Sequence, residues 1–371
     1  YSYGPFKIEG WLAGERIVLV RNEHYWRKGE GLPFLDEVAF VFPGDSRALV
    51  AALVSGEVDV VTQDGLEITQ FDELEQAAAD GRLVPYYVPG AAWEHIDFNL
   101  NPSDDRVAFG ACKEIRRAIA LGTDRAAMVG EIQKGKTKVL DTFLPEGHWA
   151  HPDAVDLVTY PYDPEKARQM LDDLGFRDAD ADGVREAQSD IVCTIEDPSG
   201  DMVAKTIPAD TALEMTLNTT SGSEMRQQTT LLFQQNMKDI GVAIDLAYVA
   251  ADVFLDAGRD GPLTARRYDL AEFAWLTGVQ PPVDLYTCGR IPSAANDWAG
   301  QNSTGWCLPE YDDLGLLAET ALDRTDAIPL YVRAQALFAE SLPVVPLFAR
   351  VKVMGTSPRL LNFRPNATAT S

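Results

Sequence analysis

The residues best suited to hold a metal ion are three aspartates at alternate positions, Asp178, Asp180 and Asp182, followed directly by Gly183. Carboxylate oxygens are ligands that calcium prefers, and a glycine permits the sharp turn that lets alternate side chains converge on one ion. A complete calcium loop has a bidentate Glu at its twelfth position, where this chain has Ser189. The pattern predicts a calcium site, and a solvated acidic turn is the alternative. No other cofactor is expected.

The familiar catalytic motifs are absent from the sequence. It contains no Gly-x-Ser-x-Gly, no His-Glu-x-x-His and no Gly-x-Gly-x-x-Gly. Residues 130–137 match a P-loop by letter, but a helical pattern precedes them and an extended one follows, the reverse of the order that phosphate binding needs. His148 and His151 have the spacing of nickel or zinc ligands on a helix, although neighbouring prolines and a glycine favour a loop. We therefore expect that the chain is not an enzyme.

Composition indicates a globular chain of two or three domains, since it has 371 residues, 46% of them hydrophobic. The net charge of −25 disfavours nucleic acid and anionic lipid as partners, because both are polyanions. No uninterrupted apolar run approaches the ~20 residues that cross a bilayer. The sequence starts at Tyr1 without an initiator Met or a signal peptide, so we expect a processed or fragmentary form of a longer protein.

The four cysteines, Cys112, Cys193, Cys288 and Cys307, include no Cys-x-x-Cys pair, which argues against a zinc or thioredoxin-like site. They permit three pairings, and the sequence alone does not choose among them. Cys288 and Cys307 flank a loop rich in Pro, Asn and Gly, so a disulfide that closes this loop is the local choice and leaves Cys112 for Cys193. In an oxidising compartment each bridge contributes ~2–4 kcal/mol. Four buried free thiols are the alternative.

Two apolar segments far apart in the sequence have the pattern of strands. In residues 94–101, Ile96, Phe98 and Leu100 alternate with polar residues, which predicts a strand with one buried face. Residues 344–351 form a second apolar segment, and the roughly 250 residues between the two are enough for a complete lobe. We interpret the segments as crossings between two lobes, the first formed by residues 1–98 and 346–371 and the second by residues 99–345.

Alternating strand and helix patterns predict an α/β fold. In the first lobe, strands are expected at 17–22, 38–43 and 58–61, with a helix at 47–55 that Gly56 ends. In the second lobe, helices are expected at 164–174, 226–240 and 329–342, with strands at 213–219 and 242–246. A strand, a helix and a strand in this order favour a parallel sheet, whose ligand cleft lies at the strand ends.

Several longer motifs follow one another along the whole chain. They are Gly-Pro-Phe-Lys-Ile-Glu-Gly-Trp at 4–11, Asn-Glu-His-Tyr-Trp at 22–26, Ser-Gly-Glu-Val-Asp at 55–59, Phe-Asn-Leu-Asn at 98–101, Tyr-Pro-Tyr-Asp-Pro at 160–164 and Gly-Gln-Asn-Ser-Thr-Gly-Trp-Cys at 300–307. In this order the motifs resemble those of the extracellular solute-binding proteins of family 5. These are the dipeptide-, oligopeptide- and nickel-binding components of ABC importers.

The resemblance implies a two-lobed α/β fold of the periplasmic-binding-protein type, in its type II, large cluster C form. It implies an extracytoplasmic, monomeric protein that captures a small organic or peptide-like solute between its lobes and delivers it to an ABC permease in the membrane. Family members usually carry a long segment before the Gly-Pro-Phe motif, so we expect an incomplete first lobe and a lipid anchor upstream. The alternative is an extracytoplasmic hydrolase, such as a carboxylate-dependent glycosidase.

The resemblance also suggests where solute binds. Peptide-binding members place an aspartate for the ligand's amino terminus three residues after the tryptophan that corresponds to Trp275, and this chain has Gly278 there. Without that carboxylate, a free α-ammonium group loses an ion pair, which disfavours ordinary short peptides. The candidate binding residues near this position are Asn99, Trp275, Thr277, Gly278 and Gln280.

A second group of candidates lies on the loop between Cys288 and Cys307. Its amides and rings suit a polar organic solute or a sugar, because buried polar atoms need partners and rings supply contact area. The candidates are Asn296, Trp298, Gln301, Asn302 and Trp306. For Trp298 and Trp306 the alternative is that they pack the loop onto the lobe, since large aromatic residues are commonly core residues.

Overall fold

The computed structural model describes residues 3–42, 46–153, 156–197 and 200–365. The chain divides into two compact units, the first formed by residues 1–86 and 353–364 and the second by residues 87–352. Two strands, β5 (Val84–Phe98) and β13 (Val344–Thr356), each continue from one unit into the other. The assignment of residues 1–98 with 346–371 and of residues 99–345 to two lobes stays a prediction. None of the described helices is long and apolar enough to cross a membrane.

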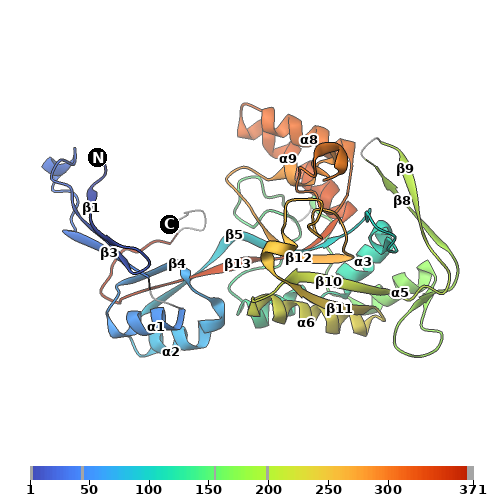
Figure 1. Ribbon diagram of the computed structural model, residues 1–371, viewed down its shortest axis with the longest axis horizontal. Coiled ribbons are helices and arrows are strands. Elements are labelled where there is room, and N and C mark those ends of the chain that lie inside the picture. The colour runs from blue at the N-terminus through green and yellow to red at the C-terminus, as the bar shows by residue number, and fades with distance from the viewer. Residues whose placement is uncertain (1–2, 43–45, 154–155, 198–199, 366–371) are drawn as a thin grey trace. The chain divides into compact units, whose positions relative to one another are not determined.

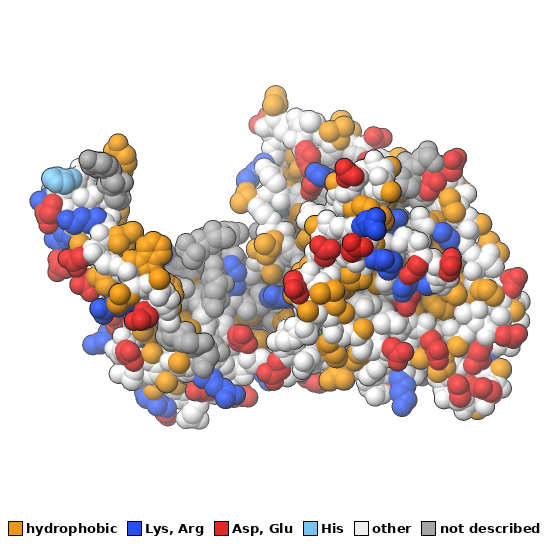
Figure 2. Space-filling view, in the orientation of Figure 1, with side chains coloured by type: hydrophobic (Ala, Val, Ile, Leu, Met, Phe, Trp, Pro, Cys, Tyr) orange, Lys and Arg blue, Asp and Glu red, His pale blue; other side chains and the backbone are white. Residues whose placement is uncertain are grey.

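The first unit contains a three-stranded antiparallel sheet of β1 (Phe6–Leu12), β2 (Arg16–Arg21) and β3 (Glu37–Val41). Among the residues of these strands, all of which the structure describes, none is buried. Ile8, Leu19 and Val38 lie opposite one another, with Ile17 opposite Phe40 two positions along. Figure 2 shows hydrophobic side chains exposed over this sheet. An apolar sheet face usually packs against a second layer, and this face remains open among the described residues.

The core of the first unit is formed by α1 (Ser46–Ser55), β4 (Val60–Leu66), α2 (Phe71–Ala79) and the end of β13. Its buried side chains include Val50, Leu53, Val61, Leu66 and Leu74. β4 pairs antiparallel with Val353, Gly355 and Thr356 of β13. The predicted helix and its end are confirmed, because Gly56 follows α1 with φ of 80°, a conformation that ends helices and that glycine adopts without strain.

The second unit is built on a sheet with the strand order β11 (Ala243–Val249), β10 (Glu214–Thr220), β12 (Leu270–Leu276), β5 and β13 (Figure 1). β10 is parallel to both β11 and β12, whereas β5 runs antiparallel to β12. The carboxyl ends of β10, β11 and β12 therefore meet at one edge of the sheet. The middle of β5 lies at the same edge, because Trp93 is opposite Trp275 and Ala92 is opposite Leu276.

Helices cover this sheet, with α6 (Glu224–Asp239) packed on β10 and β11, and α8 (Pro309–Thr320) packed on α9 (Arg324–Ser341). In the view of Figure 1, α6 lies below these strands and α8 with α9 lie above. α3 (Lys113–Gly122) packs on α5 (Pro164–Leu174). The remaining elements are short: α4 (Arg125–Ala127), α7 (Ala251–Phe254), the pair β6 (Phe176–Arg177) and β7 (Glu186–Ala187), and the hairpin of β8 (Ile191–Glu196) and β9 (Met202–Ile207).

The predicted α5, α6, β10 and β11 are confirmed, whereas two predicted boundaries are wrong. β5 ends at Phe98 and not at Asn101, because the backbone N–H groups of Asn99 and Leu100 donate to the carbonyls of Asp269 and Thr304 outside the strand pair. α9 begins at Arg324 and contains Pro329 instead of starting there. Pro329 therefore lies beyond the first turn, where a proline removes a backbone hydrogen bond and crowds the preceding turn, and the helix continues through it at that cost.

Both predicted disulfides are present in the structure, Cys112 with Cys193 and Cys288 with Cys307. The Cα atoms are 5.1 Å apart in the first pair and 4.6 Å apart in the second. All four cysteines belong to the second unit, and none is left as a free thiol. The first bridge joins β8 to the residue before α3, and the second closes the loop that the sequence singled out.

We predict that Cys288→Ser combined with Cys307→Ser lowers the free energy of unfolding by about 3 kcal/mol, because the open loop gains entropy in the unfolded chain. Urea unfolding of the double variant and of the unchanged protein, both under oxidising conditions, measures the difference. Unfolding curves that coincide would contradict this assignment of stability to the bridge.

Candidate functional site

The carboxyl edge of the parallel strands is where ligand sites of such sheets form, and at this edge the chain leaves β12 through Thr277. Thr277 is buried, its N–H donates to the carbonyl of Ala91 at 2.8 Å, and its hydroxyl donates to the carbonyl of Phe143 at 3.0 Å. These bonds fix the start of residues 278–280, which are all exposed. Among the predicted binding residues, Gly278 and Gln280 are therefore open to a solute, whereas the hydroxyl of Thr277 is an anchor.

His148 and Trp149 hold the exposed segment from the other side. The indole N–H of Trp149 donates to the carbonyl of Val279 at 2.7 Å, and Nε2 of His148 lies 3.2 Å from the same oxygen. Nδ1 of His148 accepts the N–H of Ala150, so the proton of the neutral ring is on Nε2 and donates to Val279. Burial lowers the pKa of His148, which favours this neutral form. Among the described residues, His148 and His151 belong to no group of three metal-ligating side chains.

The other two candidates near this edge differ in how open they are. Trp275 is half-buried, and its ring packs edge-on against Phe273 with the centroids 5.3 Å apart. Asn99 is buried at 2% exposure, and its amide donates to the carbonyls of Arg266 and Tyr268 at 2.8 and 2.7 Å. Trp275 can therefore offer ring surface to a solute, whereas Asn99 ties the end of β5 to the segment before β12.

The loop candidates divide in the same way. Asn302 is fully buried, and its amide donates to the carbonyls of Thr287 and Trp306. Trp306 is 6% exposed and packs against Tyr311 and Phe338. These two residues attach the loop to the rest of the unit. For Trp306 this agrees with the alternative that it packs the loop onto the lobe. The side chain of Asn296 donates to the carbonyl of Ile291 and accepts the N–H of Ser293 in the same loop. Trp298 is half-buried and Gln301 is exposed.

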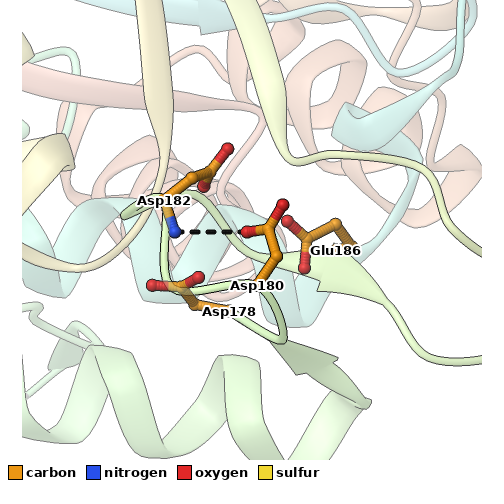
Figure 3. Close-up of side chains that lie close together, drawn as sticks. All are labelled: Asp178, Asp180, Asp182 and Glu186. Atoms are coloured by element: carbon orange, nitrogen blue, oxygen red, sulfur yellow. Dashed lines mark hydrogen bonds between the residues drawn. The ribbon is translucent and has the colours of Figure 1, made fainter.

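The acidic turn brings its carboxylates together between β6 and β7 (Figure 3). One carboxylate oxygen from each of Asp178, Asp180, Asp182 and Glu186 lies within 4.8 Å of the others. Backbone N–H groups inside the turn bond to one oxygen of each side chain, for example that of Asp182 to Asp180 at 3.2 Å. Glu186 brings a fourth carboxylate to this group, whereas the twelfth position of the loop has Ser189. The chemistry of this donor set fits a hard cation such as calcium, and calcium binding stays a prediction.

Comparison with known proteins assigns the family. The model of the bacterial extracellular solute-binding proteins, family 5 Middle, matches residues 2–293. This protein belongs to family 5. Oligopeptide-binding protein AppA of Bacillus subtilis is 24% identical over 93% of this chain, and the peptide transport periplasmic protein SapA of Salmonella typhimurium is 22% identical over 94%. The family-5 chain spans 56% and 54% of these two relatives.

Solved structures share the fold of this family-5 chain. The oligopeptide-binding protein of Thermus thermophilus, complexed with a pentapeptide, superposes with a TM-score of 0.70 at 26% identity over 95% of this chain and 58% of its own. NikA of Brucella suis, in complex with Fe(III)-EDTA, superposes with a TM-score of 0.73 at 18% identity over 98% of this chain and 66% of its own. The predicted two-lobed, periplasmic-binding-protein-like α/β class is thus confirmed.

A buried charge cluster, formed by Glu94, Glu272, Arg226 and the partly exposed Arg350, involves the strands β5 and β12 that lead to the candidate site of this family-5 protein. Glu94 on β5 and Glu272 on β12 are diagonal neighbours on one face of the sheet, and both are fully buried. Arg350 of β13 pairs with one oxygen of Glu94, and Nη2 of Arg226 lies 3.4 Å from the other. Nε of Arg226 lies 3.6 Å from Glu272, which also accepts the hydroxyl of Thr219 at 2.5 Å.

The two glutamates of the buried charge cluster have opposite protonation tendencies. Burial acts to raise the pKa of Glu94, but the Arg226 and Arg350 cations outweigh it and hold that pKa below the usual value. Burial and the adjacent Glu94 raise the pKa of Glu272 well above the usual range. Glu272 therefore favours its protonated form beside an ionised Glu94, because burial and the neighbouring negative charge both disfavour a second carboxylate.

Sequence reasoning missed the buried charge cluster and the hydrogen bonds from Trp149 and His148 to the carbonyl of Val279. The signal for the cluster is a lone glutamate inside each of two apolar strands, at Glu94 and in Leu-Ala-Glu-Phe-Ala-Trp-Leu around Glu272. The arginines come from segments far away in the sequence, so no local pattern reveals them. His148 was considered only as a metal ligand, and its bond to a carbonyl 131 residues away has no sequence signature.

We predict that Glu272→Gln reduces the loss of folding stability that accompanies rising pH. The pKa of Glu272 in the folded protein lies above its value of about 4.5 in the unfolded chain. The contribution of this group to stability is therefore fully present below pH ~4.5 and is lost as the pH rises toward the folded-state pKa. Between pH ~5.5 and ~8.5 the unchanged protein should lose up to about 1.4 kcal/mol per pH unit through this group. Gln keeps the size and a donor but cannot ionise. Urea unfolding across this range measures both slopes, and equal slopes contradict a protonated Glu272.

If calcium binds the acidic turn, its addition should raise the melting temperature, because a ligand that binds only the folded state stabilises it. Asp180→Asn, which keeps the acceptor for the Asp182 N–H but removes a charge, should reduce the shift. Asp256→Asn, an exposed aspartate outside the turn, should leave it unchanged. A melting temperature that calcium does not change speaks for the solvated turn.

Proposed function

We propose that this protein is the substrate-binding component of an ABC importer that captures a peptide-like organic solute outside the cytoplasm and delivers it to a permease. Membership of the family supports the proposal, and so do the names of relatives that bind oligopeptides or serve peptide transport. We further propose that the protein acts as a monomer and that its full-length form carries a lipid anchor.

The observation that carries the proposal is the exposed segment 278–280, held rigid at the edge of the sheet. Thr277 fixes its start, and Trp149 with His148 fixes the carbonyl of Val279. Exposed backbone groups of this segment other than the carbonyl of Val279 can bond to amide groups of a solute, and Trp275 offers an adjacent ring surface. A binding site needs such pre-organised polar groups beside apolar area, because ordering a mobile loop would reduce affinity.

The alternative function, a carboxylate-dependent hydrolase, finds no support in the buried charge cluster. Glu94 and Glu272 are neighbouring carboxyl groups, but both have no exposed surface and are engaged with Arg226, Arg350 and Thr219. A general acid must reach its substrate within hydrogen-bond distance. We therefore propose capture without chemical conversion, and turnover on a panel of chromogenic glycosides and esters should be absent.

The experiment that identifies the solute is native mass spectrometry of the purified protein. The expected result is a non-covalent adduct that dissociates on gentle activation and whose mass matches a small peptide or a related amide. The same compound, added back to stripped protein, should raise its melting temperature. A product of altered mass appearing during incubation would overturn the non-catalytic proposal.

We predict that this protein does not discriminate a free from an acetylated peptide amino terminus, since Gly278 offers no carboxylate. Gly278→Asp should favour the free amine by about tenfold, the value of one charge-assisted hydrogen bond. A Cβ at Gly278 would approach other atoms no closer than 3.7 Å, so the side chain fits. Gly278→Asn is the matched control without charge. Titration calorimetry with both peptide forms measures the preference, and equal behaviour of the Asp and Asn variants would contradict a site at Gly278.

A further inference from the structure

A groove of about 460 Å³ runs along β8 in the second unit, apart from segment 278–280. Five consecutive residues of β8, from Val192 to Glu196, line it. When both faces of a strand contribute to a cavity, the cavity follows the edge of that strand and not one of its faces. The opposite wall and floor come from the start of α3 and from the end of the disulfide-closed loop, and they include Lys113, Glu114, Arg116, Trp306 and Leu308.

The edge of β8 that faces this groove has unpaired backbone groups. The hairpin pairs Ile195 with Val203 and Cys193 with Lys205, and the N–H of Asp197 donates to the carbonyl of Asp201 in the same register. Because antiparallel pairs alternate between bonded and non-bonded ones, Val192, Thr194 and Glu196 direct their N–H and C=O groups away from β9. Within the described part of the chain, the sheet has no third strand and these outward groups have no backbone partner.

The groove has fixed walls. Cys193 points inward from β8 and is bonded to Cys112, the residue directly before α3, so the strand edge is tied to the helix that forms the opposite wall. Trp306 is held by Tyr311 and Phe338 at the floor. An extended segment that enters would meet a fixed row of donors and acceptors along one side and an apolar floor below.

The exposed charges around the groove are predominantly negative, and the cation of Arg116 lies buried behind them. Arg116 is 5% exposed, and its guanidinium donates to the carbonyls of Gly110, Ser341 and Leu342. The ammonium of Lys113 lies 3.4 Å from Glu340. Glu114 is exposed and Glu196 is half-buried at the rim. The groove therefore complements a positively charged ligand, in a chain that itself carries a net charge of −25.

We propose that this groove binds a free, extended, cationic peptide as a third strand beside β8. Its backbone would bond to the outward groups of Val192, Thr194 and Glu196, which is the β-augmentation mode of peptide recognition. One side chain would cover Trp306, and Lys or Arg side chains would face Glu114 and Glu196. The groove is separate in sequence and in its lining residues from the segment proposed to bind the transported solute.

The decisive test is a pair of proline variants on the two edges of one hairpin. Thr194→Pro removes an outward N–H from the edge that lines the groove, whereas Ala204→Pro removes the corresponding N–H from the other edge, since Thr194 and Ala204 are cross-strand partners. Proline is tolerated at such edge positions. The probe is the acetylated and amidated pentapeptide Lys-Val-Lys-Val-Lys, measured by titration calorimetry. Thr194→Pro should weaken binding about tenfold or more, and Ala204→Pro should leave it unchanged.

Two further measurements locate the peptide and define its chemistry. Hydrogen exchange should slow at residues 192–196 on addition of the probe, and Glu114→Gln with Glu196→Gln should weaken binding and its dependence on salt. The same peptide with alternate backbone nitrogens methylated should not bind. The proposal is overturned if the probe does not bind, if both proline variants bind alike, or if residues 192–196 become protected by raising the protein concentration alone, which would assign the edge to a second copy of the chain.

Discussion

The ion pair between Glu94 and the two arginines of the buried charge cluster is the constraint on which the second unit depends. It joins β5, β13 and α6, three elements that are far apart in the sequence, around the fully buried carboxylate of Glu94. Removing one partner of such a pair leaves an uncompensated buried charge, which costs far more than the pair itself contributes. The proton on Glu272 follows from the same arrangement, because Arg350 pairs with Glu94 alone, Arg226 lies near both carboxyl groups, and burial beside the Glu94 charge disfavours a second carboxylate. The register of β5 against β12, and with it the position of Trp275, is thereby specified by electrostatics as well as by packing.

How much of the fold the sequence predicts depends on whether the signal is local. Gly56 after α1 and the alternation through Ile96 and Phe98 are local patterns, and each led to the correct element. The end of β5 was predicted wrongly because it depends on hydrogen-bond partners far away in the sequence, Asp269 and Thr304. The start of α9 was predicted wrongly because it depends on whether the helix can contain Pro329. The disulfide pairing was predicted from one short loop, and the second bridge then followed by elimination.

The candidate site shows the same difference between features with a local sequence signal and features that depend on distant partners. Gly278 and Gln280 are accessible as expected, because a residue after a strand end at the ligand edge of a sheet has few neighbours to bury it. Asn99, Asn302 and Trp306 proved to be engaged in holding segments together, and residue type alone cannot separate an amide that binds a ligand from one that binds the chain's own carbonyls. The tie from Trp149 to Val279 could not be predicted, since a side chain that bonds to a distant backbone carbonyl leaves no pattern in either segment.

The location of both disulfides in the second unit has a practical consequence for how the protein is handled. The first unit contains no cysteine, so a reducing environment weakens one half of the molecule and leaves the other as it was. Protein expressed in the reducing cytosol of a host would therefore have a first unit of unchanged stability and a second unit destabilised by the loss of its disulfides. Such a sample would pass a test of overall secondary structure although its second unit is destabilised. Export of the chain to an oxidising space, or oxidative refolding, is thus a condition for obtaining the state described here.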